Sequence, residues 1–294
     1  MFKTEKENNM NTKLIRFDWA MKTLLRDKAN FDILEGFLSA VLREEVQVLQ
    51  ILEHKPTHFD KEINYLDVLI KDSKQQYMVI DLQNHFMVAP YLLESILSGG
   101  AKVLTNNIEL NQNYREVGKI ISICILHFDI GLGSDYIYYG NTELRGLHDN
   151  HSPIFQRRGL DETLEKFKSQ TIFPEYYLIN VEGFADVIKT DLDEWIYFLK
   201  HSEVRSDFNA KHIDKVSEKL VSSKMNCEEY SRYQYYMMYI VNMQDQLNTA
   251  FSQGFQDGIA LGIAKKMLGT GMDIKTIAAM TGLSPSEITD LNKI

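Results

Sequence analysis

Two neighbouring runs of strand-forming residues constrain the fold of this chain more than any other feature. Residues 63–72 (INYLDVLIKD) and 76–84 (QYMVIDLQN) are joined by a short segment in which Asp72 and Ser73 favour a hairpin turn. A third run, residues 119–130 (KIISICILHFDI), is nearly all apolar, which is typical of a strand covered on both faces of its sheet. We therefore expect a sheet with a central hairpin, flanked by helices.

The order of the other elements places the chain in the mixed α/β class. Apolar residues at helical spacing predict one or two helices in residues 17–42, and from about residue 205 the pattern is all-helical. The order is not a clean alternation of strand and helix, so a doubly wound parallel sheet is disfavoured. The remaining expected elements are strands at residues 46–54, 135–144 and 175–184, and helices at residues 90–108 and 191–203.

Charge and composition restrict the class of protein. With 41 acidic and 32 basic side chains the net charge is -9, which argues against a broad basic surface that coats DNA but leaves room for a local basic channel. Cys124 and Cys227 are far apart and favour a reducing compartment over a disulfide framework. The first residues are too polar for a signal peptide, and no segment reaches the roughly 20 apolar residues of a membrane span. We expect a cytoplasmic protein with no membrane contact.

The hairpin carries two acids whose separation depends on its register. Asp81 and Gln83 share one face of their strand, while Leu82 points to the other. If paired residue numbers sum to 147, Asp67 lies opposite Ile80, and if they sum to 148 it lies opposite Asp81. Two adjacent carboxylates repel unless a cation lies between them, and Mg²⁺ or Mn²⁺ suits such oxygen ligands. The alternative is that both acids are strand-end residues that reach solvent.

The spacing of these residues resembles a known signature. Asp67, thirteen residues and then Asp81-Leu82-Gln83 is similar to the PD-(D/E)XK motif of the Rpn-type recombination-promoting nuclease/transposase family. The likeness covers most of residues 14–294, including FDWAMKTLLRDKANFDILEGFL near the start and IAAMTGLSPSEI near the end. The resemblance implies a restriction-endonuclease-like core and a Mg²⁺-dependent endonuclease that hydrolyses phosphodiester bonds in DNA, linked to recombination or mobile DNA.

The resemblance also implies roles for the residues of the hairpin. Asp67 and Asp81 are expected to hold the metal ion, with the carbonyl group of Leu82 as a further ligand. Gln83 occupies the place of the superfamily's lysine; its amide can orient a water or a phosphate oxygen but supplies no positive charge and no general base. Asp81 stands where the family usually has Glu, a carboxylate longer by one methylene.

Two helices complete the implied site. In the first, Asp18 is expected to be an additional acid near the metal ion, and Lys22, one turn along, is expected to contact phosphate. The alternative for these two is an ordinary surface pair. In the helix that follows the hairpin, Ser95 and Ser98 stand where the resemblance predicts an Arg and a Tyr that face the site. Loss of the arginine removes a cation that clamps phosphate. The alternative function is therefore a catalytically impaired relative that binds DNA or a partner protein.

We expect the chain to divide into four parts. These are a disordered tail (residues 1–13), a nuclease-like domain (14–204), a helical connector (205–266) and a small helix-turn-helix-like module (267–294). In the module, Asp273 is placed to cap one helix and Ser284 to begin a capping box for the next.

The second helix of the module is poorly suited to reading DNA bases. It offers Glu287 and Asp290 before Lys293, although acids are repelled by phosphate and base reading favours Arg, Lys, Asn or Gln. Packing or homo-oligomerisation through the C-terminal helices is therefore favoured over base reading. In the connector, glycines recur at a four-residue interval, which permits close approach of two helices or marks a flexible segment; they are Gly254, Gly258 and Gly262.

Overall fold

The computed structural model describes residues 14–23, 25, 27–52, 68–83, 91–107, 119–128, 133–158 and 164–291. The chain divides into two compact units, Met1–Tyr233 and Gln234–Ile294. The predicted limits of the tail, connector and terminal module stay predictions. Among the described residues, no helix is both long and apolar enough to cross a membrane.

The first unit is built on a six-stranded mixed sheet of order β1-β2-β3-β4-β8-β5. The neighbours β3, β4 and β8 run parallel, and the other pairs are antiparallel. The predicted central hairpin is present as β2 and β3, and the α/β class is confirmed. The strands are β1 (Val48–Leu52), β2 (Val68–Asp72), β3 (Tyr77–Gln83), β4 (Ile120–Leu126), β5 (Ile137–Asn141) and β8 (Glu175–Asn180).

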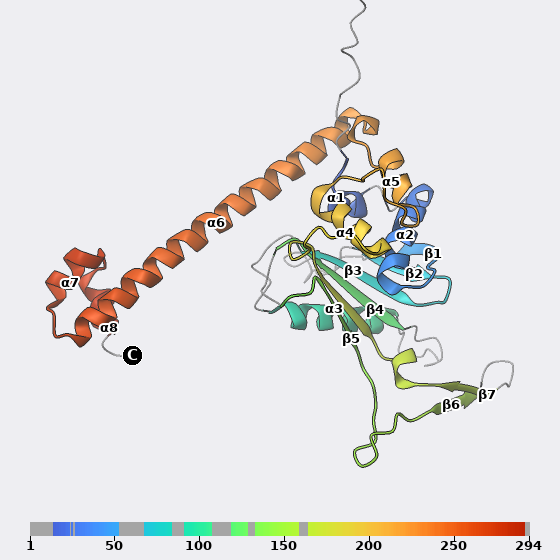
Figure 1. The fold of residues 1–294 in the computed structure, drawn as a ribbon, viewed down its shortest axis with the longest axis horizontal. Helices are drawn as coiled ribbons and strands as arrows, with labels where there is room; N and C mark the ends of the chain where they lie inside the picture. Colours follow the sequence, from blue (N-terminus) through green and yellow to red (C-terminus); the bar gives the residue numbers. More distant parts are fainter. Residues whose placement is uncertain are drawn as a thin grey trace, which may run out of the picture. The chain divides into compact units, whose positions relative to one another are not determined.

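Helices cover both faces of this sheet, and as a result every residue of β4 is buried. Helix α3 (Leu92–Asn107) lies on one face, and α1 (Phe17–Lys22), α2 (Phe31–Leu42) and α4 (Asp191–His201) lie on the other (Figure 1). Successive side chains of β4 point alternately to the two helical layers. Those of Cys124 and Leu126 pack with Leu92 of α3. The fully apolar strand predicted from the sequence is thus the centre of a three-layer arrangement.

Aromatic side chains fix α1 against α2 and α4. The ring centroids of Phe17 and Phe37 lie 5.2 Å apart, and those of Phe17 and Phe198 lie 5.8 Å apart. Trp195 contacts all three rings and is fully buried. Close packing also requires Gly36, where an added Cβ would lie 2.3 Å from the carbonyl oxygen of Lys211. The layer that carries Asp18 is therefore rigidly supported.

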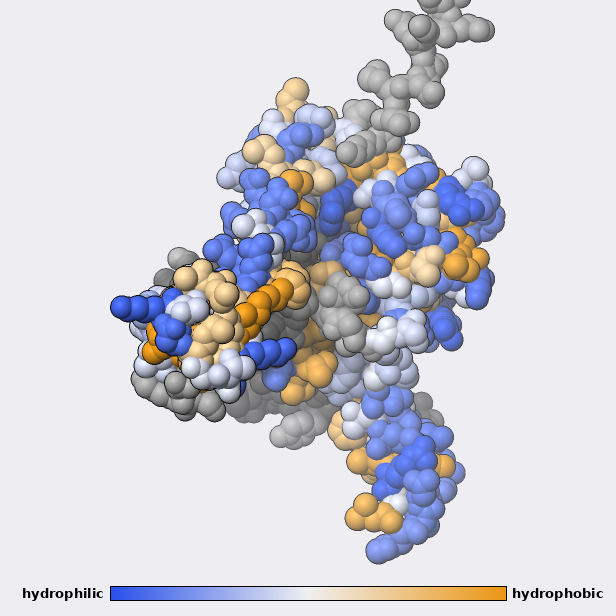
Figure 2. Space-filling view, turned by 60° about the vertical axis from the view of Figure 1, so that its left-hand side comes forward, coloured by the Kyte–Doolittle hydropathy of each residue, from blue (hydrophilic) through white to orange (hydrophobic). Residues whose placement is uncertain are grey.

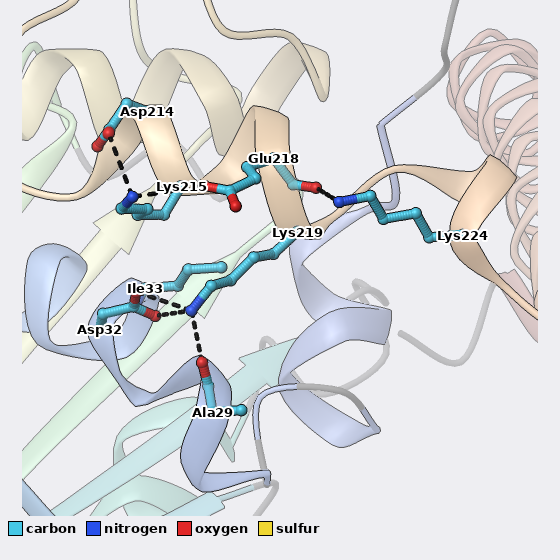
Figure 3. A network of polar contacts seen from close by, with 8 residues as sticks. All are labelled: Ala29, Asp32, Ile33, Asp214, Lys215, Glu218, Lys219 and Lys224. Carbon is cyan, nitrogen blue, oxygen red and sulfur yellow. Dashed lines mark hydrogen bonds and ion pairs between the residues drawn. The ribbon is translucent and has the colours of Figure 1, made fainter.

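Polar contacts tie the segment after α4 to the same layer. Helix α5 (Ile213–Lys219) ends at Lys219, whose Nζ donates to both carboxylate oxygens of Asp32 at 2.8 Å and to the carbonyl oxygen of Ala29 (Figure 3). Further along, the backbone N–H of Ile15 donates to the carbonyl oxygen of Leu220 at 2.8 Å. These contacts hold the chain immediately before and after α1.

A small hairpin between β5 and β8 was not predicted. Its strands are β6 (Phe155–Arg158) and β7 (Leu164–Phe167), and every residue of β6 is exposed. The hairpin has no buried face, so its sequence shows no alternation of apolar and polar residues. Stacking of Phe155 on Phe167 (ring centroids 5.9 Å apart) and an ion pair between Arg157 and Glu165 (2.7 Å) stabilise it instead.

The second unit is helical. Helix α6 (Cys227–Gly269) leads into α7 (Ile274–Thr281) and α8 (Pro285–Leu291), and the side chains of Ala264, Ile277 and Ile288 form a small buried core between them. Asp273 caps α7 by accepting the N–H of Thr276 at 3.0 Å, and Gly282 ends it with φ of 73°. Ser284 and Glu287 form a capping box before α8. Short 3-10 turns elsewhere are η1 (Lys28–Asn30), η4 (Ser169–Thr171) and η5 (Ser222–Lys224).

Candidate functional site

Asp81 lies near the end of β3 and is buried, with 6% of its surface exposed. It pairs with Cys124 of the parallel strand β4. Because Cys124 packs on α3, strand alternation places the Asp81 side chain on the α3 face of the sheet, and Leu82 points to the opposite face, where it is also buried. The buried position excludes a carboxylate that simply reaches solvent.

The β2–β3 hairpin has the second of the two registers expected from the sequence, in which paired residue numbers sum to 148. Val68 pairs with Ile80 and Leu69 with Val79, so that paired numbers sum to 148. If the pairing continues by one residue, position 67 lies opposite Asp81. Asp67 itself and the side chain of Gln83 lie outside the described residues.

The turn of this hairpin explains how the register is fixed. Oδ1 of Asp72 accepts the N–H of Gln76 at 2.7 Å, and Gln75 has the left-handed backbone conformation with φ of 61°. Burial raises the pKa of the Asp72 carboxyl, while backbone hydrogen bonds oppose the rise. The turn chemistry identified in the sequence therefore sets the alignment of the two strands.

A small cavity separates Asp81 from α3. It has a volume of about 10 Å³, and Ser95 and Ser122 line it together with Asp81. Ser95 Oγ donates to the carbonyl oxygen of Leu92 at 2.8 Å. Ser98 is exposed, so only one of the two serines considered in the sequence faces the cavity.

Asp18 is buried in the opposite helical layer, with 1% of its surface exposed. Its carboxylate pairs with Arg16, with Nη2 and Oδ2 at 2.8 Å, and also accepts the N–H of Trp19 at 2.7 Å. The alternative of an ordinary surface pair is therefore wrong for Asp18, because its carboxylate is buried and is held by Arg16 and by the backbone of Trp19. Lys22 is the last residue of α1, and its side chain lies outside the described part of the chain.

His127, directly after β4, was missed in the sequence. Its Nε2 is fully buried, and no hydrogen-bond partner for it lies in the described part of the chain. Burial lowers the pKa of this imidazole to about 4; the negative charge of Asp18 opposes this effect and the positive charge of Arg16 adds to it. The sequence signal for it is a histidine that directly follows a run of seven mostly apolar residues, Ile120–Leu126.

The described residues do not by themselves form a complete metal site. Within them, no group of three His, Cys, Asp or Glu side chains is placed to hold a metal ion. Asp81 lies on the α3 face, whereas Asp18 belongs to the layer that contains α1, α2 and α4 (Figure 1). The predicted ligand set thus depends on Asp67.

Matches to two protein-family models identify the family of this chain. Residues 15–151 match the model of the PD-(D/E)XK nuclease family transposase, and residues 260–293 match the Rpn/YhgA-like nuclease family, C-terminal HTH domain. Together the two matches cover more than half of the chain. The chain belongs to the Rpn/YhgA-like PD-(D/E)XK family. No curated protein and no solved structure matches it significantly.

Membership in the Rpn/YhgA-like PD-(D/E)XK family links the chain to nuclease chemistry and mobile DNA. The six-stranded mixed sheet with flanking helices agrees with the fold of this family. Its nucleases typically use divalent metal ions, and Asp81 fits this use as a buried oxygen donor. The nuclease and helix-turn-helix matches also suggest DNA binding.

Proposed function

We propose that this Rpn/YhgA-like protein is a Mg²⁺- or Mn²⁺-dependent DNA endonuclease acting in recombination or on mobile DNA. The observation that carries the proposal is the buried Asp81 in a hairpin whose described pairs sum to 148, the register that would bring Asp67 opposite Asp81 if the pairing continues by one residue. A carboxylate held in low dielectric next to a second carboxylate needs a cation to stay ionised. Asp67, Asp81 and the carbonyl oxygen of Leu82 would hold that cation.

The proposed roles follow from the chemistry of each group. When bound, the ion would activate a water and offset negative charge on the scissile phosphate. Gln83 would orient that water or a phosphate oxygen through its amide. Asp18, which forms an ion pair with Arg16, would be an additional acid, and Lys22 would contact a phosphate.

Nicking of supercoiled plasmid tests this proposal. We expect cleavage in Mg²⁺ or Mn²⁺, no cleavage in EDTA, and loss of cleavage in Asp67→Asn and in Asp81→Asn. Asp214→Asn is the matched control, because this carboxylate is exposed on α5. Equal cleavage in EDTA, or full activity of Asp81→Asn, refutes the assignment.

A second candidate is a catalytically impaired relative that binds DNA or a partner protein. It is favoured by Ser95, which lines the cavity beside Asp81 and stands where the resemblance predicts an arginine. We expect cleavage in wild type, with Ser98→Ala as a silent control because Ser98 is exposed. Binding of DNA without turnover in wild type, with cleavage gained in a folded Ser95→Arg variant, favours the second candidate instead.

We also propose that the protein forms a homo-oligomer through α6. Between Tyr233 and Ala264 the sequence has only two charged residues, Asp245 and Asp257. Large apolar side chains remain exposed there, including Phe251 at 77% and Phe255 at 63%, and exposed hydrophobic residues of this unit are visible in Figure 2. A helix that is apolar on several faces requires a partner surface.

The spacing of the apolar residues supports a second copy of the chain as that partner. Steps of four and three residues connect eight positions of α6, and all but one of these are apolar or small: Tyr236, Ile240, Met243, Leu247, Ala250, Gly254, Asp257 and Leu261. This repeat is the pattern of a helix-pairing seam.

Light scattering after size exclusion tests the association. We expect a mass above that of one chain for wild type, and a monomer for Ile240→Glu, because the substitution places a charge in the seam. Asn242→Glu adds the same charge at an exposed position outside the seam and should leave the mass unchanged. A monomeric wild type contradicts the proposal.

A further inference from the structure

We infer that Ser122, Ser95 and Asp81 hold one buried water molecule in the cavity between α3 and strands β3 and β4, and that this water positions the Asp81 carboxylate. The positioning role rests on the proposed function of Asp81 as a metal ligand. The water site itself rests only on the packing and the hydrogen-bonding capacity of the three side chains.

The register of the parallel strands brings the three groups together. Val79 pairs with Ser122, and Asp81 pairs with Cys124. The side chains of Ser122 and Asp81 therefore lie on the same face of neighbouring strands, offset by two residues in register. Ser95 faces them from α3. The cavity volume of about 10 Å³ matches the space of one water molecule.

Close approach of α3 to the sheet shapes this space. Gly99 lines the cavity, and a Cβ added at Gly100 would lie 3.6 Å from Ser122 Oγ. The backbone of α3 therefore sits directly over the serine without filling the cavity beside Asp81. Only a group as small as water fits between them.

The hydrogen-bonding capacities of the three side chains are complementary to a water molecule. Ser122 Oγ is fully buried and has no hydrogen-bond partner among the described residues. The hydroxyl of Ser95 already donates to Leu92, so its oxygen can only accept a further bond, and a carboxylate can only accept. A water that accepts from Ser122 and donates to Ser95 and to Asp81 makes three bonds, the usual number for a buried water.

This arrangement would support Asp81 differently from the arginine that the resemblance predicts at position 95. A guanidinium would pair with the carboxylate and supply a positive charge. A neutral water would fix the orientation of the carboxylate without adding a positive charge beside it. Partners of this kind around metal ligands typically change metal affinity by roughly 10- to 100-fold.

The direction of a stability change separates a water-bonded hydroxyl from an isolated one. In urea unfolding without metal, we expect Ser122→Ala to lower the midpoint, because the substitution removes a bond that the water accepts. The effects of Ser122→Ala and Ser95→Ala should be less than additive, because both act on one water. Ser98→Ala is the control on the exposed side of the same helix. A raised midpoint in Ser122→Ala would show an unsatisfied hydroxyl and overturn the inference.

A second pair of measurements tests the water and its positioning role. A high-resolution crystal structure should show density between Ser122 Oγ and Asp81, and this density should be lost in Ser122→Ala. Calorimetric Mn²⁺ affinity should weaken about tenfold in Ser122→Ala and stay unchanged in Ser98→Ala. An unchanged affinity in Ser122→Ala refutes the positioning role. If Asp81→Asn also leaves Mn²⁺ affinity unchanged, the proposed function fails, while the stability and density results still decide whether the water is present.

Discussion

The buried imidazole of His127 should make the stability of the protein depend on pH in a calculable way. Burial lowers its pKa from 6.5 to about 4, with the charge of Asp18 opposing and that of Arg16 assisting. The unfolded chain therefore binds a proton between these two values that the folded chain does not bind. Full protonation of the unfolded state against a neutral folded state is worth about 3 kcal/mol, at 1.4 kcal/mol per pKa unit.

The sign of the effect follows from proton linkage. Stability rises with pH wherever the unfolded state binds more protons, so the contribution of His127 is fully present above pH 6.5 and is lost as the pH falls toward 4. Between pH 7 and pH 5 the expected loss in unfolding free energy is about 2 kcal/mol.

Urea unfolding of wild type and His127→Gln across this pH range isolates the histidine, because all other titrating groups are shared by both proteins. We expect the wild type to lose about 2 kcal/mol more than the variant between pH 7 and pH 5. His151→Gln is the control, since this histidine is exposed in the loop before β6. Parallel pH profiles for wild type and His127→Gln would refute the reasoning.

Three further changes should report on packing, on a buried carboxylate and on α6. Gly36→Ala should lower the melting temperature and cost about 3 kcal/mol, because the new Cβ would lie 2.3 Å from a backbone carbonyl oxygen. Asp193→Asn should cost about 2 kcal/mol in urea unfolding, because the carboxylate accepts hydrogen bonds from the Tyr136 hydroxyl at 2.6 Å and from Thr190. Gly258→Ala should raise the stability of α6 by about 1 kcal/mol in thermal unfolding, since no atom of the described chain lies within 4 Å of the new methyl group; a fall would indicate close packing at this glycine in an oligomer.

The hairpin could be predicted from sequence because its information is local. The polar residues between the two apolar runs specify the turn, and alternation assigns Asp81 and Leu82 to opposite faces. The sequence left two registers open, because a shift of one residue in the turn satisfies the same pattern. The bond from Gln76 to Asp72 and the left-handed Gln75 select one of them.

The surroundings of the two acids could not be predicted in the same way, because they come from residues far apart in the chain. Ser122 lines the same cavity as Asp81 because β3 and β4 pair in parallel. The backbone N–H of Arg16 donates to the hydroxyl of Tyr233, 217 residues further on, at 3.2 Å. No periodicity within a single segment encodes such contacts.

These surroundings indicate what would change at the proposed metal site because Ser95 stands where the resemblance predicts an arginine. A guanidinium beside Asp81 would assist phosphate binding but compete with a metal ion for the same carboxylate. With Ser95 both effects would be absent, and the water that we infer beside Ser122 would keep the carboxylate oriented without adding a charge. The proposed metal binding and the proposed phosphate binding would therefore be separable in this chain. A defect caused by Ser95 should appear as weakened substrate binding, whereas a defect in the Ser122 contact should appear first as weakened metal binding.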